Sequence, residues 1–197
     1  MNIDPKELDH DSMHNIFLGV VVPRPVVLVS TIGEDGIFNL APFASFATLC
    51  NKPAIVKINV GRKKDGQKKD TLVNIESTKD FVISIVTETL AKAMKQASKV
   101  YPSDVDEFQE VGLTPAKSDL VKSPLVAESP VNMECKLLEI KKYGDFPQDT
   151  SVVIGEVVRI HIKDELYVNG KIQVTALRVI GRIGDIYCRT TDTIDVE

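Results

Sequence analysis

Apolar and polar residues alternate along much of this 197-residue chain, and a two-residue period is typical of β-strands. Strands are expected at residues 24–31, 37–48, 54–60, 80–86, 131–141, 151–162 and 173–180. The first is followed by Gly33-Glu34-Asp35-Gly36, whose glycines favour a tight turn. Pro42 lacks the N–H that a central strand needs, so the second strand must kink or lie at a sheet edge. Seven strands divided by turn residues predict a mainly β fold, a closed or split barrel with a few short helices.

Two segments have helical spacing instead. One helix is expected over residues 88–98, because its apolar residues recur at i, i+3, i+4 and i+7: Leu90, Ala93, Met94 and Ala97. A shorter helix is expected over residues 71–77, with Asp70 as its N-cap. Residues 101–130 hold four of the ten prolines and predict a long excursion over the surface. Loops of this length are usually functional or cover another part of the protein.

Length and charge restrict the class of protein. A chain of 197 residues suits one domain, so residues 1–197 are interpreted as a single unit. The net charge of −4 and the pI near 5.5 argue against general nucleic-acid binding. No uncharged apolar stretch is long enough for a membrane helix, and the acidic start of the chain is unlike a signal peptide. We therefore expect a cytoplasmic protein.

Cysteine and histidine residues predict no metal site. Cys50, Cys135 and Cys188 are an odd number without close spacing, which fits neither a disulfide framework nor a zinc site. We expect all three to be packed in the core, where free cysteine is commonly buried. His10 and His14 have the spacing of two ligands on a helix, but no third ligand accompanies them.

The segment of residues 62–71 is the most informative for function. It carries five cations and two acids in an acidic protein, and it leads into a predicted helix. A helix N-terminus offers free N–H groups and a partial positive charge, which together attract a phosphate. Arg62 and Lys69 can add full charges, and Thr71 can add a hydroxyl donor. A solvated, lysine-rich loop would give the same pattern.

A second candidate region lies on the first two predicted strands. Ser30, Thr31 and Asn39 can form hydrogen bonds with the edge of a heteroaromatic ring, and small residues near Ala41 and Ser45 leave room for a flat ring. An ordinary barrel strand with polar residues facing outward explains the same pattern.

Together, these segments resemble the flavin reductase-like, FMN-binding split-barrel family. The resemblance covers nearly the whole chain, and its motifs are Pro23-Arg24-Pro25, Asn39-Leu40-Ala41-Pro42-Phe43, Lys69-Asp70-Thr71 and Gly181-Arg182-Ile183-Gly184-Asp185. Ala44 replaces the family's usual serine, and Asp185 replaces a usual glycine.

The resemblance implies an FMN cofactor and an oxidoreductase. The implied cofactor-binding residues are Arg24, Ser30, Thr31, Asn39, Leu40, Ala41, Ser45, Phe46, Arg62, Lys69, Asp70, Thr71, Asn74 and Tyr187. Arg62, Lys69 and Thr71 would bind the phosphate, and a homodimer is implied. Electrons would come from NAD(P)H or from a redox protein. A flavoredoxin-like carrier, an FMN storage module and a barrel with an empty site remain alternatives. No catalytic acid or base is assigned, because the flavin would carry the chemistry.

Overall fold

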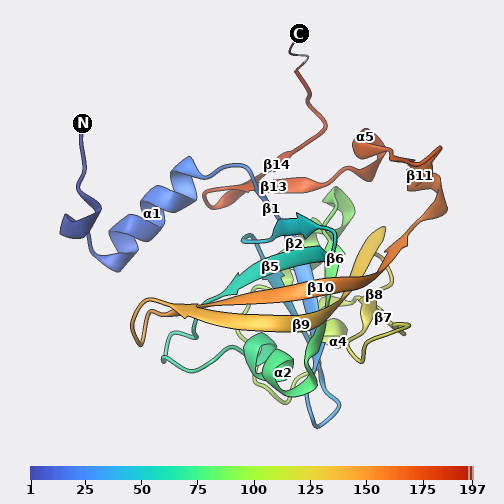
Figure 1. The fold of residues 1–197 in the computed structure, drawn as a ribbon, viewed down its shortest axis with the longest axis horizontal. Coiled ribbons are helices and arrows are strands. Elements are labelled where there is room, and N and C mark those ends of the chain that lie inside the picture. The colour runs from blue at the N-terminus through green and yellow to red at the C-terminus, as the bar shows by residue number, and fades with distance from the viewer. Residues whose placement is uncertain (195, 197) are drawn as a thin grey trace.

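A single antiparallel sheet dominates the computed structural model, which describes residues 1–194 and 196 (Figure 1). Its seven strands are ordered β3 (Phe38–Phe43), β2 (Val27–Ile32), β6 (Asp80–Ile85), β9 (Val131–Tyr143), β10 (Thr150–Ile162), β5 (Ala54–Val60) and β4 (Ala47–Asn51). Every neighbouring pair in this order is antiparallel. The prediction of a mainly β fold with short helices is confirmed.

Three smaller sheets and several short helices complete the described residues. The small sheets are β1 (Arg24–Pro25) with β13 (Ile180–Ile183) and β14 (Ile186–Arg189), β7 (Pro115–Ala116) with β8 (Leu125–Val126), and β11 (Tyr167–Val168) with β12 (Lys171–Ile172). The α-helices are α1 (His10–Val20), α2 (Asp70–Thr78), α3 (Ala91–Gln96), α4 (Glu107–Val111) and α5 (Val174–Leu177). The 3₁₀ turns are η1 (Pro5–Glu7), η2 (Glu88–Leu90) and η3 (Asp164–Leu166). None of the helices in the described part of the chain is long and apolar enough to cross a membrane.

The sheet carries a hydrophobic core on each face, because successive side chains of a strand point to opposite faces. Leu28 of β2 packs in one cluster with residues of α3 and α4. Its neighbours Val27 and Val29 pack in the other cluster. That second cluster joins Phe43, near one end of the strand order, to Ile58, near the other end. The sheet therefore curves around this cluster.

Most predicted elements are confirmed, and two helix predictions are among them. The helix expected at 71–77 is α2, and the one expected at 88–98 is η2 followed by α3, with Leu90, Met94 and Ala97 buried. Pro42 lies in β3 at a sheet edge, as its missing N–H requires.

Some element predictions are wrong. Residues 37–48 do not form one strand: they contain β3 and the first two residues of β4. Residues 173–180 form α5 and the first residue of β13, because Arg178 adopts a left-handed conformation that ends the helix. Asp70 is not the N-cap of α2: Lys69 occupies that position, and the Asp70 carboxylate is bound to Lys63.

Two burial predictions also need correction. Residues 101–130 do not only run over the surface, because they contain α4, β7 and β8 and bury Phe108 completely against the first core cluster. Cys135 is buried as predicted, but Cys50 is exposed on the edge strand β4 and Cys188 is only half-buried. An edge strand packs fewer of its side chains, so the high burial of free cysteine does not apply to Cys50.

Candidate functional site

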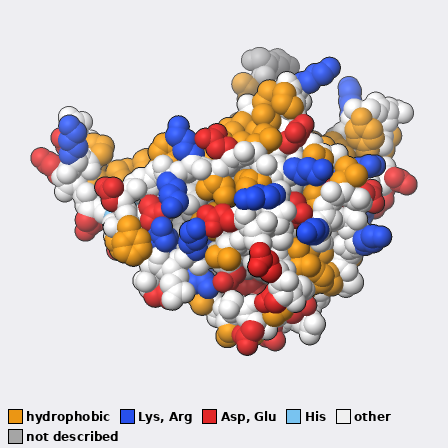
Figure 2. All heavy atoms as spheres, turned by 60° about the horizontal axis from the view of Figure 1, so that its bottom comes forward, with side chains coloured by type: hydrophobic (Ala, Val, Ile, Leu, Met, Phe, Trp, Pro, Cys, Tyr) orange, Lys and Arg blue, Asp and Glu red, His pale blue; other side chains and the backbone are white. Residues whose placement is uncertain are grey.

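A cavity of about 620 Å³ lies between β3, the loop before α2, the α3 region and the β13–β14 hairpin. Its volume is in the range of small-molecule sites. Its lining includes seven Lys or Arg residues but only three Asp or Glu residues. The cavity is therefore cationic although the whole chain has a net charge of −4. Basic side chains are also numerous over the face of the molecule shown in Figure 2.

Internal ion pairs neutralise part of the basic loop. The Lys63 ammonium lies 2.8 Å from a carboxylate oxygen of Asp70. Lys68 is paired with Glu76 at 2.6 Å on the outer side of α2. Arg62 donates two hydrogen bonds to Asp149, and this pairing raises the pKa of Arg62 and lowers that of Asp149.

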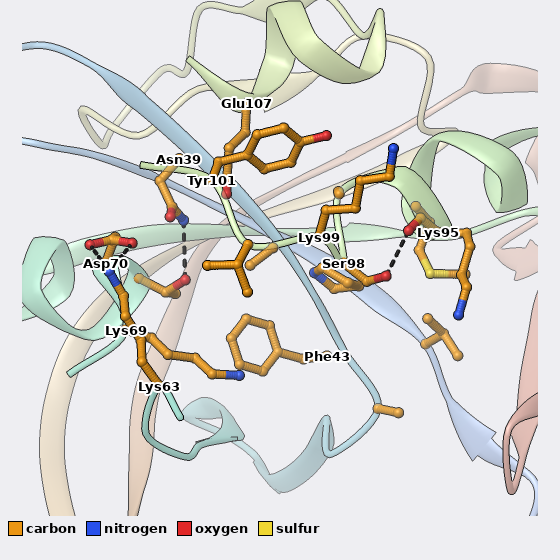
Figure 3. Close-up of a pocket in the computed structure, with 18 of the residues that line it drawn as sticks. Asn39, Phe43, Lys63, Lys69, Asp70, Lys95, Ser98, Lys99, Tyr101 and Glu107 are labelled. Atoms are coloured by element: carbon orange, nitrogen blue, oxygen red, sulfur yellow. Dashed lines mark hydrogen bonds and ion pairs between the residues drawn. The ribbon is translucent and has the colours of Figure 1, made fainter. Parts of the chain in front are cut away.

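Lys69 is left without a carboxylate partner among the described residues. Its side chain is exposed toward the cavity, with the ammonium 6.0 Å from the Phe43 ring, and partial desolvation lowers its pKa. Figure 3 shows Lys63, Lys69 and Asp70 together on one side of Phe43. Lys69 therefore provides a positive charge that is available to a ligand.

Thr71 lies in the first turn of α2, beside Lys69. Its hydroxyl oxygen accepts a hydrogen bond from the Asn39 amide at 3.1 Å, which leaves the hydroxyl proton available for a ligand. The first N–H groups of a helix have no partner within the helix, and the helix dipole is positive at this end. Lys69, Thr71 and the start of α2 thus form a candidate anion site at one end of the cavity.

A second group of cations lines the opposite side of the cavity. Figure 3 shows Lys95, Ser98 and Lys99 across Phe43 from Lys69. Arg182 of β13 and Tyr187 of β14 line the same cavity. Figure 1 shows the β1–β13–β14 sheet well separated from α2, so the cavity reaches from one region to the other.

Glu107 is an acid of the cavity lining whose pKa is raised. Its carboxylate accepts a hydrogen bond from the Leu40 N–H, and the residue lines both this cavity and a neighbouring one of about 400 Å³. Burial raises the pKa of Glu107 to about 7, and the nearby charge of Asp70 adds to this effect.

Half of the cofactor-binding residues predicted from the sequence line the cavity. They are Asn39, Ala41, Arg62, Lys69, Asp70, Thr71 and Tyr187. Asn74 lines the neighbouring cavity, where its amide donates to the Thr31 hydroxyl at 3.0 Å.

The other six predicted residues do not line either cavity. Thr31 and Leu40 are fully buried, and the buried Ser30 hydroxyl donates to the Pro124 carbonyl. The Ser45 hydroxyl bonds the backbone of Asn59, and Phe46 packs against the second core cluster. Arg24 lies on β1, where it pairs with Arg182 of β13.

The sequence reasoning missed several lining residues, among them Lys95, Lys99, Tyr101 and Glu107. Lys95 lies in the helix predicted over residues 88–98, and Lys99 follows it directly. Nothing in the sequence pattern placed this region beside the basic loop. Tyr101 and Glu107 lie in the segment interpreted as a surface excursion.

The cationic cavity beside the curved antiparallel sheet is suited to an anionic small molecule. The sequence pattern of the flavin reductase like domain matches residues 18–176, so the chain belongs to this family. The predicted family is therefore confirmed, and with it an oxidoreductase of the flavin-binding kind.

Relatives span the whole chain. An uncharacterised protein of Aquifex aeolicus is 39% identical over 183 residues, which cover 92% of this chain and 91% of its own. Nitrilotriacetate monooxygenase component B from Bacillus cereus has a TM-score of 0.95 at 29% identity, covering 100% of this chain and 98% of its own. Pseudomonas fluorescens 2-nitrobenzoate 2-nitroreductase has a TM-score of 0.89 at 30% identity, covering 100% and 95%. The fold is the split barrel of flavin reductases.

The residues present fit a phosphorylated flavin. A flat ring needs an apolar wall, which Ala41, Phe43 and Ala44 provide on β3 and just after it. A phosphate needs cations and hydrogen-bond donors, which Lys69 and Thr71 provide. Arg62 fits less well than the sequence indicated, because Asp149 and the Gly66 carbonyl already occupy three of its nitrogens.

Proposed function

We propose that the protein binds FMN in this cavity and passes electrons through it from NAD(P)H or another reduced donor. The observation that carries the proposal is the Lys69 ammonium, which has no acidic partner among the described residues and lines the same cavity as Thr71, in the first turn of α2. Phosphate is the group that such a site binds best. The family match supports a flavin, and the single free anion site at this end of the cavity supports FMN.

The protein's own groups would bind and orient the cofactor. Lys69 and Thr71 would hold the phosphate, and Asn39 would hold the Thr71 hydroxyl in place through its amide. Phe43 and Ala41 would form one wall for the ring and exclude water from it. The bound flavin supplies the hydride and electron chemistry, which no side chain can perform.

We also propose that the protein acts as a homodimer and that it acts in the cytoplasm. The exposed apolar side chains of α1 support the homodimer.

The test is to load the purified protein with FMN and add NADH or NADPH without oxygen. We expect one equivalent of FMN to bind and its absorbance to bleach after nicotinamide is added. Bound FMN that both nucleotides leave oxidised, but that reduced ferredoxin bleaches, would make the protein a carrier. Failure to bind FMN would reject the proposal.

A further inference from the structure

The cavity holds more positive charge than one flavin phosphate neutralises. Seven Lys or Arg side chains line the cavity against three acids, and Asp149 neutralises Arg62, which leaves a surplus of three charges. The FMN phosphate carries about −2 at neutral pH, so part of that surplus stays uncompensated. Two of the cavity's cations, Lys95 and Lys99, lie across Phe43 from Lys69 and have no ion-pair partner among the described residues.

Two side-chain nitrogens of Arg24, the cross-strand partner of Arg182, are buried without a partner among the described residues. Its Nε and Nη2 atoms are sealed from solvent and have no hydrogen-bond partner among the described residues. Buried guanidinium nitrogens are normally paired, because an unpaired buried donor is costly. Burial lowers the pKa of Arg24, and the neighbouring charge of Arg182 lowers it further.

Arg182 is the arginine of this pair that lines the cavity. Arg24 and Arg182 are direct partners across β1 and β13, so their side chains lie on the same face of the small sheet. Arg182 lines the cavity, whereas Arg24 does not. The acid nearest to Arg182, Asp185, is 92% exposed and 3.4 Å away, and such a pair neutralises little charge.

We infer that Arg182, supported by Arg24, forms a second anion subsite that binds a phosphate or carboxylate of the flavin's redox partner. Arg182 would contact the anion directly. Arg24 would act as a positioning residue, because its poorly screened charge strengthens the attraction at Arg182. Tyr187 and Met94 line the cavity beside Arg182, and their apolar surfaces would support a planar group carried by the same ligand. This inference rests on the proposed function.

The experiment uses the full chain loaded with oxidised FMN. NADP⁺ provides a phosphate probe and benzoate a carboxylate probe, and benzamide is the uncharged match of benzoate. Binding is followed through the flavin absorbance, so no turnover is needed. We expect Arg182→Gln to lower the affinity for the anionic probe by about tenfold or more, which is the effect of one charge-assisted hydrogen bond. Arg24→Gln should weaken it less, and Arg182→Lys should restore part of the affinity.

Controls separate this subsite from the cofactor site. FMN affinity should stay unchanged in Arg182→Gln, and a thermal-unfolding midpoint close to that of the parent protein shows that each variant folds. Arg189→Gln is the matched control, because Arg189 lies on the adjacent strand β14 and is bound to Glu88. It should change no affinity.

The outcomes are distinct. Loss of NADP⁺ binding alone assigns the subsite to a dinucleotide phosphate, loss of benzoate binding alone assigns it to a carboxylate, and loss of both supports general anion binding. Equal affinities for benzoate and benzamide, with NADP⁺ unaffected by Arg182→Gln, overturn the inference and leave the proposed function intact. A parent protein that binds no FMN overturns both.

Discussion

At the scale of single residues, Lys69 is the cation on which FMN binding is proposed to depend. Replacing Lys69 with Ala should lower the affinity for FMN by about tenfold or more, because charge-assisted hydrogen bonds to phosphate contribute roughly 1.5–3 kcal/mol. Riboflavin has no phosphate and should bind the variant as it binds the parent. Lys68→Ala is the control, since Lys68 is paired with Glu76 away from the cavity. Fluorescence titrations with both ligands measure this, and equal losses for the two would remove Lys69 from the phosphate site.

Glu107 gives a pH dependence of stability with a definite sign. Burial raises its pKa from 4.5 to about 7, so the folded protein holds a proton that the unfolded chain releases. Stability should therefore fall as pH rises from about 4.5 to about 7, by up to roughly 3 kcal/mol for this group. Asp70 and Asp106 oppose its ionisation, whereas Lys63 and the Leu40 N–H favour it. Glu107→Gln should remove this slope in urea titrations between pH 5 and pH 8, and an identical slope in both proteins would contradict it.

At the scale of elements, two buried carboxylates hold the loop between β7 and β8. Glu134 of β9 accepts hydrogen bonds from the N–H groups of three consecutive residues, 119–121, and from His161. Asp80 of β6 accepts from the N–H groups of Lys122 and Ser123. The loop therefore depends on negative charge in the sheet. Asp119, Glu134 and His161 also lie close enough together to suggest a metal site, but these donors already occupy both Glu134 oxygens.

Glu134→Gln should lower the free energy of unfolding by about 1.5–3 kcal/mol, because the amide nitrogen would face N–H donors. Burial would raise the pKa of Glu134, but hydrogen bonds from Asp119, His161 and Leu120 lower it. The carboxylate's contribution is thus present above its usual pKa and lost as pH falls through the lowered one. Urea unfolding at pH 7 measures the effect. Glu128→Gln is the control, because Glu128 is exposed and accepts from a single N–H. A loss no larger than the control's would show that the loop does not need the charge.

The same elements show what the sequence could predict. Alternation located the central strands, because residues such as Val27 and Val29 must reach one core while Leu28 reaches the other. It failed at residues 173–180, where Arg178 turns the chain. Local motifs indicated the part of the cavity around Lys69. Lys95 and Glu107 could not be found this way, because only tertiary packing brings their segments to the basic loop.

At the scale of the whole molecule, α1 has no buried residue in the single chain. Its apolar side chains Phe17 and Val20 are 56% and 69% exposed, and Ile186 in β14 is 68% exposed. Helix α1 meets the β13–β14 hairpin through a hydrogen bond from the Gly184 N–H to the Leu18 carbonyl. Exposed apolar side chains on adjacent elements are typical of an interface.

We expect the protein to be a dimer of roughly twice 21.7 kDa, since two-fold pairing is the commonest assembly. The double change Phe17→Ser and Val20→Ser should shift it toward monomer in light scattering. Leu138→Ser removes an apolar side chain of similar exposure on β9 and should leave the mass unchanged. A monomeric parent protein would contradict the prediction.

The contrast between the cationic cavity and the acidic chain also governs how fast an anion arrives. A net charge of −4 alone would repel FMN, and added salt would then speed its association. A cavity lined by cations focuses the local field and guides an anion inward despite the opposing net charge. The association rate of FMN in stopped-flow measurements should therefore fall as ionic strength rises, while that of uncharged riboflavin stays constant. An FMN rate that rises with salt would mean that the net charge, and not the cavity, controls the encounter.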